Sequence, residues 1–356
     1  MALEDAFSGF RRRDWDRDEA DGTVRIAVVG TGGFARNRAL PAIDNTEYCE
    51  TTALVTGSPD RARSLASEFD VNHVLDYEAF LAGDHASVYD AVYIATPNAT
   101  HGEYAIGAAD HGAAVLCEKP LETTVERAQG VVDACADAGV TLMTAYRLQV
   151  EPTVRRTRDL LRDGAIGEVV QIHGSFSHPL IEYAGPETWR LDPVLAGGGA
   201  LVDLGIYPLN TSRFLLEADP AGVYARTHTS GEPFEPVDEH VAFLLEFATG
   251  TTVSCTASFD AHASSRLELI GTDGRISIAS PFGGVVPQEM VVESGDVSME
   301  YTGQPVDEVC EQFDYFAYCV QTDTRPEPDG EDGVADLRAI EAAYESADTE
   351  RRISIG

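Results

Sequence analysis

The spacing of apolar residues changes character near residue 146. Between Thr23 and Tyr146, short apolar runs alternate with stretches of helical periodicity. This alternation is typical of a parallel sheet covered by helices, because each parallel strand needs a long crossover before its neighbour can form. The expected strands are 24–29, 52–55, 91–95, 114–117 and 141–144.

Beyond Tyr146 the apolar residues follow a period of two over longer segments, which indicates antiparallel strands with one buried face. Glycine-bearing turns at 248–250 and 271–274 are expected to join some of these strands as hairpins. The expected strands include 168–178, 239–247, 252–260 and 266–270. A helical spacing near the chain end predicts a helix over about 334–347, with its apolar face formed by Val334, Leu337, Ile340, Tyr344 and Ala347.

These patterns predict an α/β protein of two domains, for which 356 residues are sufficient. The first, over 23–146, is a doubly wound parallel sheet. The second, over 147–356, is an α+β domain on an open, mostly antiparallel sheet, and its C-terminal helix is a candidate to pack back on the first domain. Residues 1–22 are charged and aperiodic, and we expect them to form an N-terminal extension.

A glycine-rich turn follows the first expected strand. The sequence Gly30-Thr31-Gly32-Gly33-Phe34-Ala35 opens a helix there. Glycine is needed where the backbone turns tightly and where it approaches a pyrophosphate, and a small residue lets helix and strand pack closely. The first domain is therefore expected to be a Rossmann domain, with a dinucleotide bound by Gly30, Gly32, Gly33, Phe34 and Ala35.

The end of the second strand bears on the choice between NAD and NADP. In NAD-binding domains this strand usually ends in a carboxylate that binds the ribose hydroxyls. Here the sequence is Thr56-Gly57-Ser58 with Arg61 and Arg63 just beyond, and these groups suit a 2′-phosphate. Arg36 and Arg38 are further candidates from the first helix. NADP is expected to be preferred and NAD to bind more weakly. The alternative is that Arg61, Arg63 and the nearby Arg36 and Arg38 are ordinary solvated surface.

Two further strand ends carry polar residues. Ligands of open parallel sheets lie at the carboxyl ends of the strands, so these residues are expected to contribute to the cofactor site. His101 also has an equally plausible role as a cap or loop residue. The candidates are Thr96, Pro97, Asn98 and His101 after one strand, and Glu118, Lys119 and Pro120 after the next.

Composition separates Lys119 from every other basic residue. The chain has 25 basic residues and 60 acidic ones, a formal charge of −35, and Lys119 is its only lysine. A retained lysine among arginines indicates a need for a compact ammonium group. The acidity disfavours nucleic acid and anionic membranes as partners and suits a halophile, since molar salt reduces the screening length to ~3 Å.

Several other classes of protein are disfavoured. The six cysteines form no CxxC pair and have no histidine at metal-ligand spacing, so neither a metal site nor a disulfide framework is expected. Arg11-Arg12-Arg13 is followed by charged residues rather than the apolar stretch of an export signal. No apolar run reaches the ~18 residues of a membrane span. We therefore expect a cytoplasmic protein.

A second glycine cluster precedes a helix that carries an acid and a phenol. In the sequence Gly197-Gly198-Gly199-Ala200-Leu201-Val202-Asp203-Leu204-Gly205-Ile206-Tyr207, Asp203 and Tyr207 are four residues apart. Residues at this spacing share one helix face. Taken alone, the pattern is better explained by a helix cap followed by a half-buried tyrosine.

Together, the Glu-Lys-Pro and Gly-Gly-Gly-x-x-x-Asp-x-Gly-x-Tyr sequences resemble the glucose-fructose oxidoreductase, inositol dehydrogenase and MocA family over about residues 23–356. The resemblance implies that Lys119 and Asp203 are catalytic and that Tyr207 is the acid and base. It also implies a cis peptide bond between Lys119 and Pro120. Gln149 departs from relatives that have a histidine there. The substrate residues implied are Lys119, Arg147, Trp189, Arg190, Asp203 and Tyr207.

With its acidity, the chain is most similar to the members of that family from halophilic archaea that oxidise D-xylose. The resemblance implies NADP-dependent oxidation of the C1 hydroxyl of an aldopyranose, giving D-xylono-1,5-lactone from D-xylose. It also implies a homodimer or homotetramer. The alternatives are a cyclitol or trans-dihydrodiol dehydrogenase and, more remotely, a cofactor-sensing regulator without catalytic activity.

Overall fold

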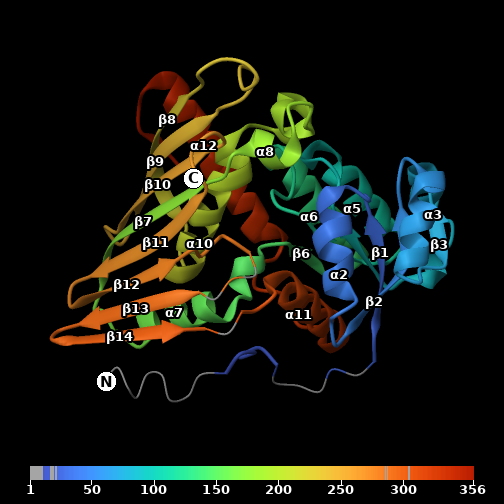
Figure 1. Cartoon of the computed structure of the whole chain (residues 1–356), viewed down its shortest axis with the longest axis horizontal. Coiled ribbons are helices and arrows are strands. Elements are labelled where there is room, and N and C mark those ends of the chain that lie inside the picture. The colour runs from blue at the N-terminus through green and yellow to red at the C-terminus, as the bar shows by residue number, and fades with distance from the viewer. Residues whose placement is uncertain (1–10, 17–19, 21, 285, 287, 304) are drawn as a thin grey trace. The chain divides into compact units, whose positions relative to one another are not determined.

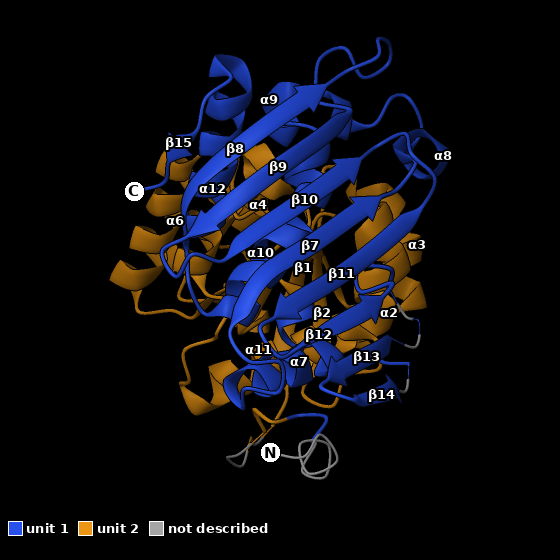
Figure 2. Ribbon diagram, turned by 90° about the vertical axis from the view of Figure 1, so that its left-hand side faces the viewer, with its two compact units in different colours: residues 1–13, 148–306, 335–356 blue, residues 14–147, 307–334 orange. Residues whose placement is uncertain are grey.

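The computed structural model describes residues 11–16, 20, 22–284, 286, 288–303 and 305–356. Much of the expected N-terminal extension, residues 1–10, 17–19 and 21, lies outside the described residues. The chain divides into two compact units, coloured separately in Figure 2. Unit 2 contains Asp14–Arg147 and Asp307–Val334, and unit 1 contains most of the rest, chiefly Leu148–Val306 and Ala335–Gly356.

Unit 2 is built on a six-stranded sheet in the order β3-β2-β1-β4-β5-β6, with every neighbouring pair parallel. Figure 1 labels β1, β2, β3 and β6 of this sheet. The central strands are apolar apart from Arg25 in the first of them, because helices cover both faces of such a sheet. This order is that of a Rossmann fold. The strands are β1 (Val24–Val29), β2 (Cys49–Val55), β3 (His73–Leu75), β4 (Ala91–Ile94), β5 (Ala114–Cys117) and β6 (Leu142–Thr144).

The helices of unit 2 begin and end at the signals that the sequence carries. The hydroxyl of Thr124 accepts a bond from the Arg127 amide to cap α6, which ends at Gly139 in the left-handed region. The helices are η1 (Ala35–Ala39, a π-helical turn), α2 (Leu40–Ile43), α3 (Pro59–Glu68), α4 (Tyr77–Leu81), α5 (His101–Asp110), α6 (Val125–Ala138) and α11 (Glu308–Thr322), with short 3-10 turns η2 (Ala86–Val88) and η3 (Asn98–Thr100).

Helix α11 departs from the expected division of the chain. The sequence predicted one boundary near residue 146, but α11 lies in unit 2, where Phe313 packs against Tyr93 with ring centres 4.9 Å apart. The α11 backbone also accepts a bond from the thiol of Cys49 at the start of β2. An amphipathic pattern specifies a buried face but not the sheet that buries it, so periodicity alone did not reveal this return of the chain.

Unit 1 contains a nine-stranded sheet in the order β14-β13-β12-β11-β7-β10-β9-β8-β15. Only the pair β7 and β10 is parallel, so the expected mostly antiparallel sheet is confirmed. The strands are β7 (Val169–Ser177), β8 (Pro220–His228), β9 (His240–Phe247), β10 (Thr252–Ser258), β11 (Ser264–Gly271), β12 (Gly274–Ala279), β13 (Glu289–Ser294), β14 (Val297–Thr302) and β15 (Ile353–Ser354).

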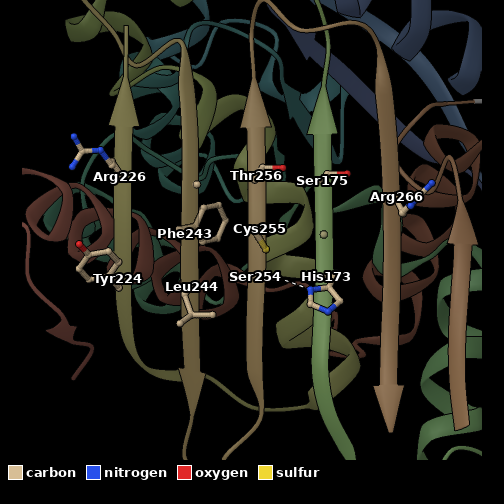
Figure 3. A pocket seen from close by; sticks show the side chains of 12 residues that line it. His173, Ser175, Tyr224, Arg226, Phe243, Leu244, Ser254, Cys255, Thr256 and Arg266 are labelled. Carbon is tan, nitrogen blue, oxygen red and sulfur yellow. Dashed lines mark hydrogen bonds between the residues drawn. The ribbon is translucent and has the colours of Figure 1, made fainter.

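The two faces of this sheet differ in burial. Along β9, Val241, Phe243 and Leu245 are buried, whereas Leu244 is 37% exposed. Alternation of this kind places one face against helices and leaves the other open. Figure 3 shows side chains on a depression of about 470 Å³ along the strands, including Tyr224 and Leu244.

The helices of unit 1 include α12, which begins within unit 2 and belongs to unit 1 from Ala335 onward. It was expected over about 334–347 and spans four more residues at its start. The helices are α7 (Pro152–Arg162), α8 (Leu180–Ala184), α9 (Pro193–Ala196), η6 (Leu201–Gly205, a π-helical turn), α10 (Ile206–Leu216) and α12 (Gly330–Thr349), with the 3-10 turns η4 (Arg147–Gln149) and η5 (Trp189–Leu191).

The α/β class and the architecture of both sheets are therefore as predicted. Strands β3, β8, β13, β14 and β15 were not among the expected strands, and β12 was indicated only by the glycine turn before it. β3 and β15 are short, whereas β14 alternates Val297, Met299 and Tyr301 with polar residues and could have been found. Among the described residues, no helix is both long enough and apolar enough to cross a membrane.

Candidate active site

The glycine-rich turn lies between β1 and the first helix of unit 2. Gly30 has φ +96°, and a Cβ placed on it would lie 2.7 Å from the carbonyl oxygen of Ala95. Only glycine fits this position. The helix starts at Gly33, and the small side chain of Ala35 is buried. The strand, turn and helix therefore have the arrangement that binds dinucleotide phosphates.

The end of β2 carries hydroxyl groups rather than a carboxylate. The hydroxyl of Thr31 donates to that of Thr56 over 2.9 Å, which joins the glycine-rich turn to this strand end. The Ser58 amide also donates to the Thr56 hydroxyl, and Gly57 and Ser58 are exposed. No acidic side chain is present between Thr56 and Ser58 to repel a 2′-phosphate.

The arginines near this strand end differ in the contacts that their side chains make. Arg63 forms an exposed ion pair with Asp60 at 3.1 Å, and Arg38 lies 3.4 Å from Asp307. Arg61 lies in the first turn of α3 and is exposed. Arg61 is thus the arginine of this group best placed to meet a group bound at the end of β2.

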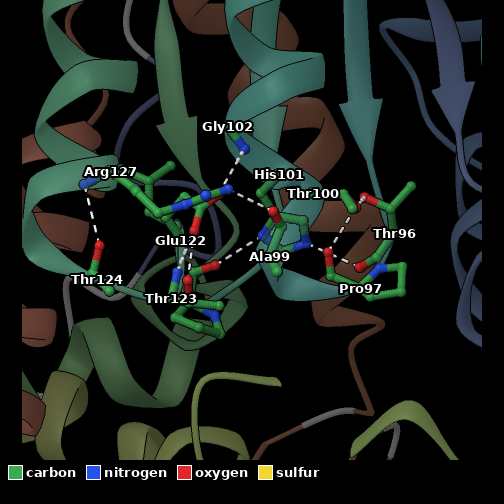
Figure 4. Close-up of polar contacts among 12 residues, drawn as sticks. Thr96, Pro97, Ala99, Thr100, His101, Gly102, Glu122, Thr123, Thr124 and Arg127 are labelled. Carbon is green, nitrogen blue, oxygen red and sulfur yellow. Dashed lines mark hydrogen bonds and ion pairs between the residues drawn. The ribbon is translucent and has the colours of Figure 1, made fainter. Parts of the chain in front are cut away.

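His101 links the ends of two strands rather than facing solvent. Its ring nitrogens lie 2.9 Å from the carbonyl oxygen of Pro120 and 3.0 Å from that of Thr96 (Figure 4). The residue is fully buried, and burial lowers the pKa of the imidazole despite these carbonyl contacts. Of its two expected roles, the geometry favours the structural one, because His101, the first residue of α5, lies buried between the segments that bear Thr96 and Pro120.

A buried carboxylate supports the same loops. Glu122 accepts bonds from the Arg127 guanidinium at 2.6 Å, from the Thr123 amide and hydroxyl, and from the Gly102 amide (Figure 4). Burial alone would raise the pKa of Glu122, but these donors outweigh it and the pKa is lowered. Arg127 also donates to the carbonyl of Ala99 at 2.6 Å. The network ties the segment after β5 to the start of α5.

Lys119 follows β5, and its peptide bond to Pro120 is cis, which confirms the expectation. The carboxylate of Glu118 accepts a bond from the Tyr93 hydroxyl at 2.7 Å and from the Lys119 amide at 3.3 Å. Burial raises the pKa of Glu118, and the charges of Lys119 and Arg147 oppose that rise. Glu118 was expected to bind the cofactor, but its carboxylate here accepts bonds from two residues of its own unit.

Arg147 forms a buried ion pair with Glu308 at the start of α11. Its side chain is 13% exposed and that of Glu308 only 2%. Arg147 was expected to line the substrate pocket, and this contact gives it a role in holding the returning helix. The sequence offered no signal for the pair because its members are 161 positions apart.

In unit 1, the helix after the glycine cluster begins with the π-helical turn η6 and continues as α10. From Ala200 to Asn210 every residue is buried except Asp203 and Tyr207, which are half-buried. A π-helical turn brings residues four apart close to one face and is frequent at functional sites. The expected pairing of Asp203 and Tyr207 on one face is therefore present.

Asp203 is held by an arginine that the sequence also singled out. The Arg190 Nε lies 3.1 Å from Asp203 Oδ2, and the Arg190 guanidinium lies over the Trp189 ring, 4.6 Å from its centre. Burial is the largest single influence and would lower the pKa of Arg190, but the charge of Asp203, the bond to it and the nearby phenols Tyr183 and Tyr207 together outweigh burial, and the pKa is raised. The three residues form one charged and aromatic group.

Sequence reasoning missed two aromatic neighbours of this group. The Tyr183 hydroxyl lies 3.5 Å from Asp203 Oδ2, and the Tyr183 ring stacks on His178 with centres 4.4 Å apart. Burial first, and the Asp203 charge second, raise the pKa of Tyr183 well above its ordinary value. Neither residue has a distinctive spacing in the sequence, so only the folded chain reveals them.

The remaining expected residues lie as follows. The Tyr207 ring packs edge-on against Phe176, with centres 5.3 Å apart, and 6.0 Å from that of Phe282. Gln149, where some relatives have histidine, is buried and donates to Asn210 at 3.0 Å. Lys119 and the expected cofactor residues belong to unit 2, whereas Trp189, Arg190, Asp203 and Tyr207 belong to unit 1.

Comparison with protein families gives matches over both parts of the chain. Residues 24–146 match a model described as an oxidoreductase family with an NAD-binding Rossmann fold. Residues 154–277 match the model of the GFO/IDH/MocA C-terminal domain. The resemblance read from the motifs is confirmed.

Three individual proteins illustrate the similarity. The D-xylose 1-dehydrogenase [NADP(+)] of Haloarcula marismortui is 42% identical, covering 100% of each chain. D-xylose 1-dehydrogenase (NADP(+)) 2 of Haloferax volcanii is 34% identical over 92% of this chain and 98% of its own. The crystal structure of aldose-aldose oxidoreductase from Caulobacter crescentus, complexed with glycerol, has a TM-score of 0.88 and 31% identity and covers 93% and 99%.

Proposed function

Because the chain belongs to the glucose-fructose oxidoreductase, inositol dehydrogenase and MocA family of oxidoreductases, we propose that it oxidises the C1 hydroxyl of an aldopyranose with NADP, and that D-xylose is its best substrate. The observation that carries the proposal is the similarity, over the full chain, to an archaeal enzyme with that activity. Lys119, Asp203 and Tyr207 are the residues we assign to the chemistry.

The geometry of unit 2 supports NADP as the cofactor. Gly32 and Gly33 are exposed, and no described protein atom lies within 4 Å of a Cβ placed on either. Protein packing does not demand glycine there, whereas close approach of a pyrophosphate does. The hydroxyl groups at Thr56 and Ser58 and the cation of Arg61 supply donors for a 2′-phosphate.

The proposed chemistry needs a proton acceptor and a positive charge at one hydroxyl. NADP, when bound, supplies the nicotinamide that takes a hydride from C1. Tyr207 accepts the proton of the C1 hydroxyl, and the Lys119 ammonium stabilises the developing oxyanion. As the hydride leaves C1, the electron pair of the broken O–H bond forms the carbonyl bond of the lactone at C1. Asp203, held by Arg190, accepts a hydrogen bond from the sugar and orients it.

The preference for a pentose follows from size. D-glucose differs from D-xylose by a hydroxymethyl group on C5, and a pocket fitted to the pentose must displace side chains or water to admit it. Such a group costs about 1–3 kcal/mol, or roughly 10- to 200-fold in kcat/KM. We therefore expect D-glucose to be oxidised less well than D-xylose.

The test is a panel of pentoses, hexoses, cyclitols and a trans-dihydrodiol, assayed in molar salt by the formation of reduced cofactor. D-xylose with NADP should give the highest kcat/KM, with D-xylono-1,5-lactone as the product. A higher kcat/KM for myo-inositol or a dihydrodiol would make the substrate assignment wrong and favour the cyclitol or dihydrodiol alternative. Absence of turnover with every compound would leave the cofactor-sensing regulator as the better reading.

The open face of the unit 1 sheet supports an oligomer. Tyr224 is 46% exposed and Leu244 37% exposed on neighbouring strands of this face (Figure 3). We propose that this face pairs with that of a second copy, giving a dimer or a tetramer. Leu244→Asp should lower the mass measured by light scattering, and an unchanged mass would exclude this face.

A further inference from the structure

The helix that carries Asp203 and Tyr207 starts without a capping side chain of its own. Its N-cap residue is Ala200, which three glycines precede. The alanine side chain cannot accept a hydrogen bond. The first amides of a helix have no partner within the helix. Buried amides of this kind need acceptors from elsewhere, since leaving one unpaired costs stability.

Asp238 supplies these acceptors from the segment before β9. Its carboxylate accepts bonds from the Gly199 amide at 2.7 Å and from the Leu201 amide at 2.8 Å. Its backbone carbonyl accepts a bond from the Ala200 amide, also at 2.8 Å. Three consecutive amides are therefore satisfied by one residue that is distant in the sequence.

Tyr344 in α12 fixes Asp238 in turn. The Tyr344 hydroxyl donates to Asp238 Oδ1 over 2.6 Å and accepts a bond from the Gly199 amide over 3.2 Å. Asp238 is 8% exposed. Burial raises the pKa of Asp238, which shows that desolvation is only partly offset by its donors.

The close approach of Asp238 accounts for glycine at position 199. A Cβ placed on Gly199 would lie 2.1 Å from the carbonyl oxygen of Asp238 and 2.8 Å from its nitrogen. Backbone atoms cannot withdraw as a flexible side chain can. This glycine of the Gly-Gly-Gly sequence is thus explained by packing within unit 1.

We propose that Asp238 and Tyr344 are positioning residues that clamp the start of the catalytic helix and thereby set the placement of Asp203 and Tyr207. The clamp bonds Gly199, Ala200 and Leu201, and Asp203 follows Leu201 by two residues. A displacement of reacting groups by ~1 Å can cost ~10²-fold in rate. This inference rests on the proposed roles of Asp203 and Tyr207.

Tyr344→Phe tests the clamp, because it removes one hydroxyl and keeps the ring. We expect kcat to fall about 10-fold while the KM for NADP changes less than about 2-fold, since the lost contact acts on chemistry rather than on cofactor binding. The matched control is Tyr315→Phe, which also removes a hydroxyl that accepts a backbone amide, from Glu327 at 3.0 Å. It should leave kcat unchanged. An equal fall in kcat for both variants would overturn the proposal.

A combined variant separates positioning from general destabilisation. If Tyr344 acts through Asp203 and Tyr207, adding Tyr344→Phe to a variant that carries both Asp203→Asn and Tyr207→Phe should lower the residual rate by less than about 2-fold. A further 10-fold fall on adding Tyr344→Phe to that background would overturn the proposal. Asp238→Asn, which keeps the shape but cannot accept both amides, should lower kcat more than Tyr344→Phe does.

Hydrogen exchange gives a readout that does not depend on the substrate. The amides of Gly199, Ala200 and Leu201 should exchange at least ~10-fold faster in Tyr344→Phe than in the wild type, because local opening becomes easier. Unchanged exchange rates of these three amides would be sufficient to overturn the proposal. Absence of sugar oxidation by the wild type would instead count against the proposed function, so the two failures are distinguishable.

Discussion

The Nε atom of Arg190 lies 3.1 Å from Oδ2 of Asp203, and both side chains are largely buried. A carboxylate in such a place needs a partner to remain charged, because burial disfavours the ionised form. The neighbouring Trp189 ring fixes the guanidinium from one side. Arg190 therefore fixes the direction of the acid that we assign to substrate orientation.

Replacing Arg190 should consequently damage catalysis rather than folding alone. Arg190→Gln is expected to lower kcat/KM for the sugar by about 10- to 100-fold, equivalent to ~1.4–2.7 kcal/mol, because a charge-assisted bond to Asp203 is lost. Steady-state kinetics measure this. Arg162→Gln is the control, since it removes an exposed pair with Glu217 and should leave kcat/KM unchanged. A wild-type rate in Arg190→Gln would contradict the assignment.

Lys119→Met should lower kcat by at least ~10²-fold while NADP still binds, since the ammonium acts on the reacting hydroxyl. The kinetics should be accompanied by fluorescence titration with NADPH, to separate binding from turnover. A variant that keeps a tenth of the normal turnover would remove Lys119 from the mechanism.

Tyr207→Phe should be as severe, because it removes the proton acceptor and keeps the contact with Phe176. Tyr183→Phe is the comparison, since its hydroxyl also lies near Asp203. We expect Tyr183→Phe to lower kcat less than Tyr207→Phe does and to leave the pH–rate profile unchanged. The reverse order of severity would make Tyr183 the acid and base.

Arg61→Ala should raise the KM for NADP more than that for NAD. Losing one charge-assisted contact with the 2′-phosphate costs ~1.5–3 kcal/mol, less where molar salt screens the site. Arg63→Ala provides the control because its guanidinium pairs with Asp60 on the exposed side of α3. Equal kcat/KM with NAD and NADP in the wild type would defeat the cofactor assignment.

The ion pair between Glu122 and Arg127 should appear in the pH dependence of stability. The pKa of Glu122 is lowered in the folded chain, so its contribution is present above the ordinary pKa and is lost as the pH falls through the lowered value. Arg127→Met should cost about 1 kcal/mol at neutral pH, discounted because the guanidinium is half exposed.

Thermal unfolding of this variant and of the wild type between pH 7 and about pH 3, below the ordinary glutamate pKa, measures the effect. The difference in Tm should shrink toward acid pH. Arg275→Met, which removes an exposed pair with Glu293, should shift Tm much less. A difference in Tm that grows toward acid pH would contradict the lowered pKa of Glu122.

The sequence by itself determined the features that depend on local patterning. Strand and helix periods separated the two kinds of sheet, and the turn at Gly30 could be read because only glycine adopts its φ of +96° beside Ala95. The spacing of Asp203 and Tyr207 predicted a shared face because helix geometry is local. Local geometry needs only neighbouring residues, and these are present in any sequence window.

Only the tertiary structure decided which distant residues meet. Helix α11 packs in unit 2 although it follows the antiparallel strands, and Glu308 thereby binds Arg147. Asp238 caps a helix that begins 37 positions before it, and its carboxylate accepts a bond from the amide of that first residue, Leu201. These partners are chosen by close packing and by the need to satisfy buried amides and charges. Neither requirement leaves a periodic signal in the chain, so the partners become visible only when the chain has folded.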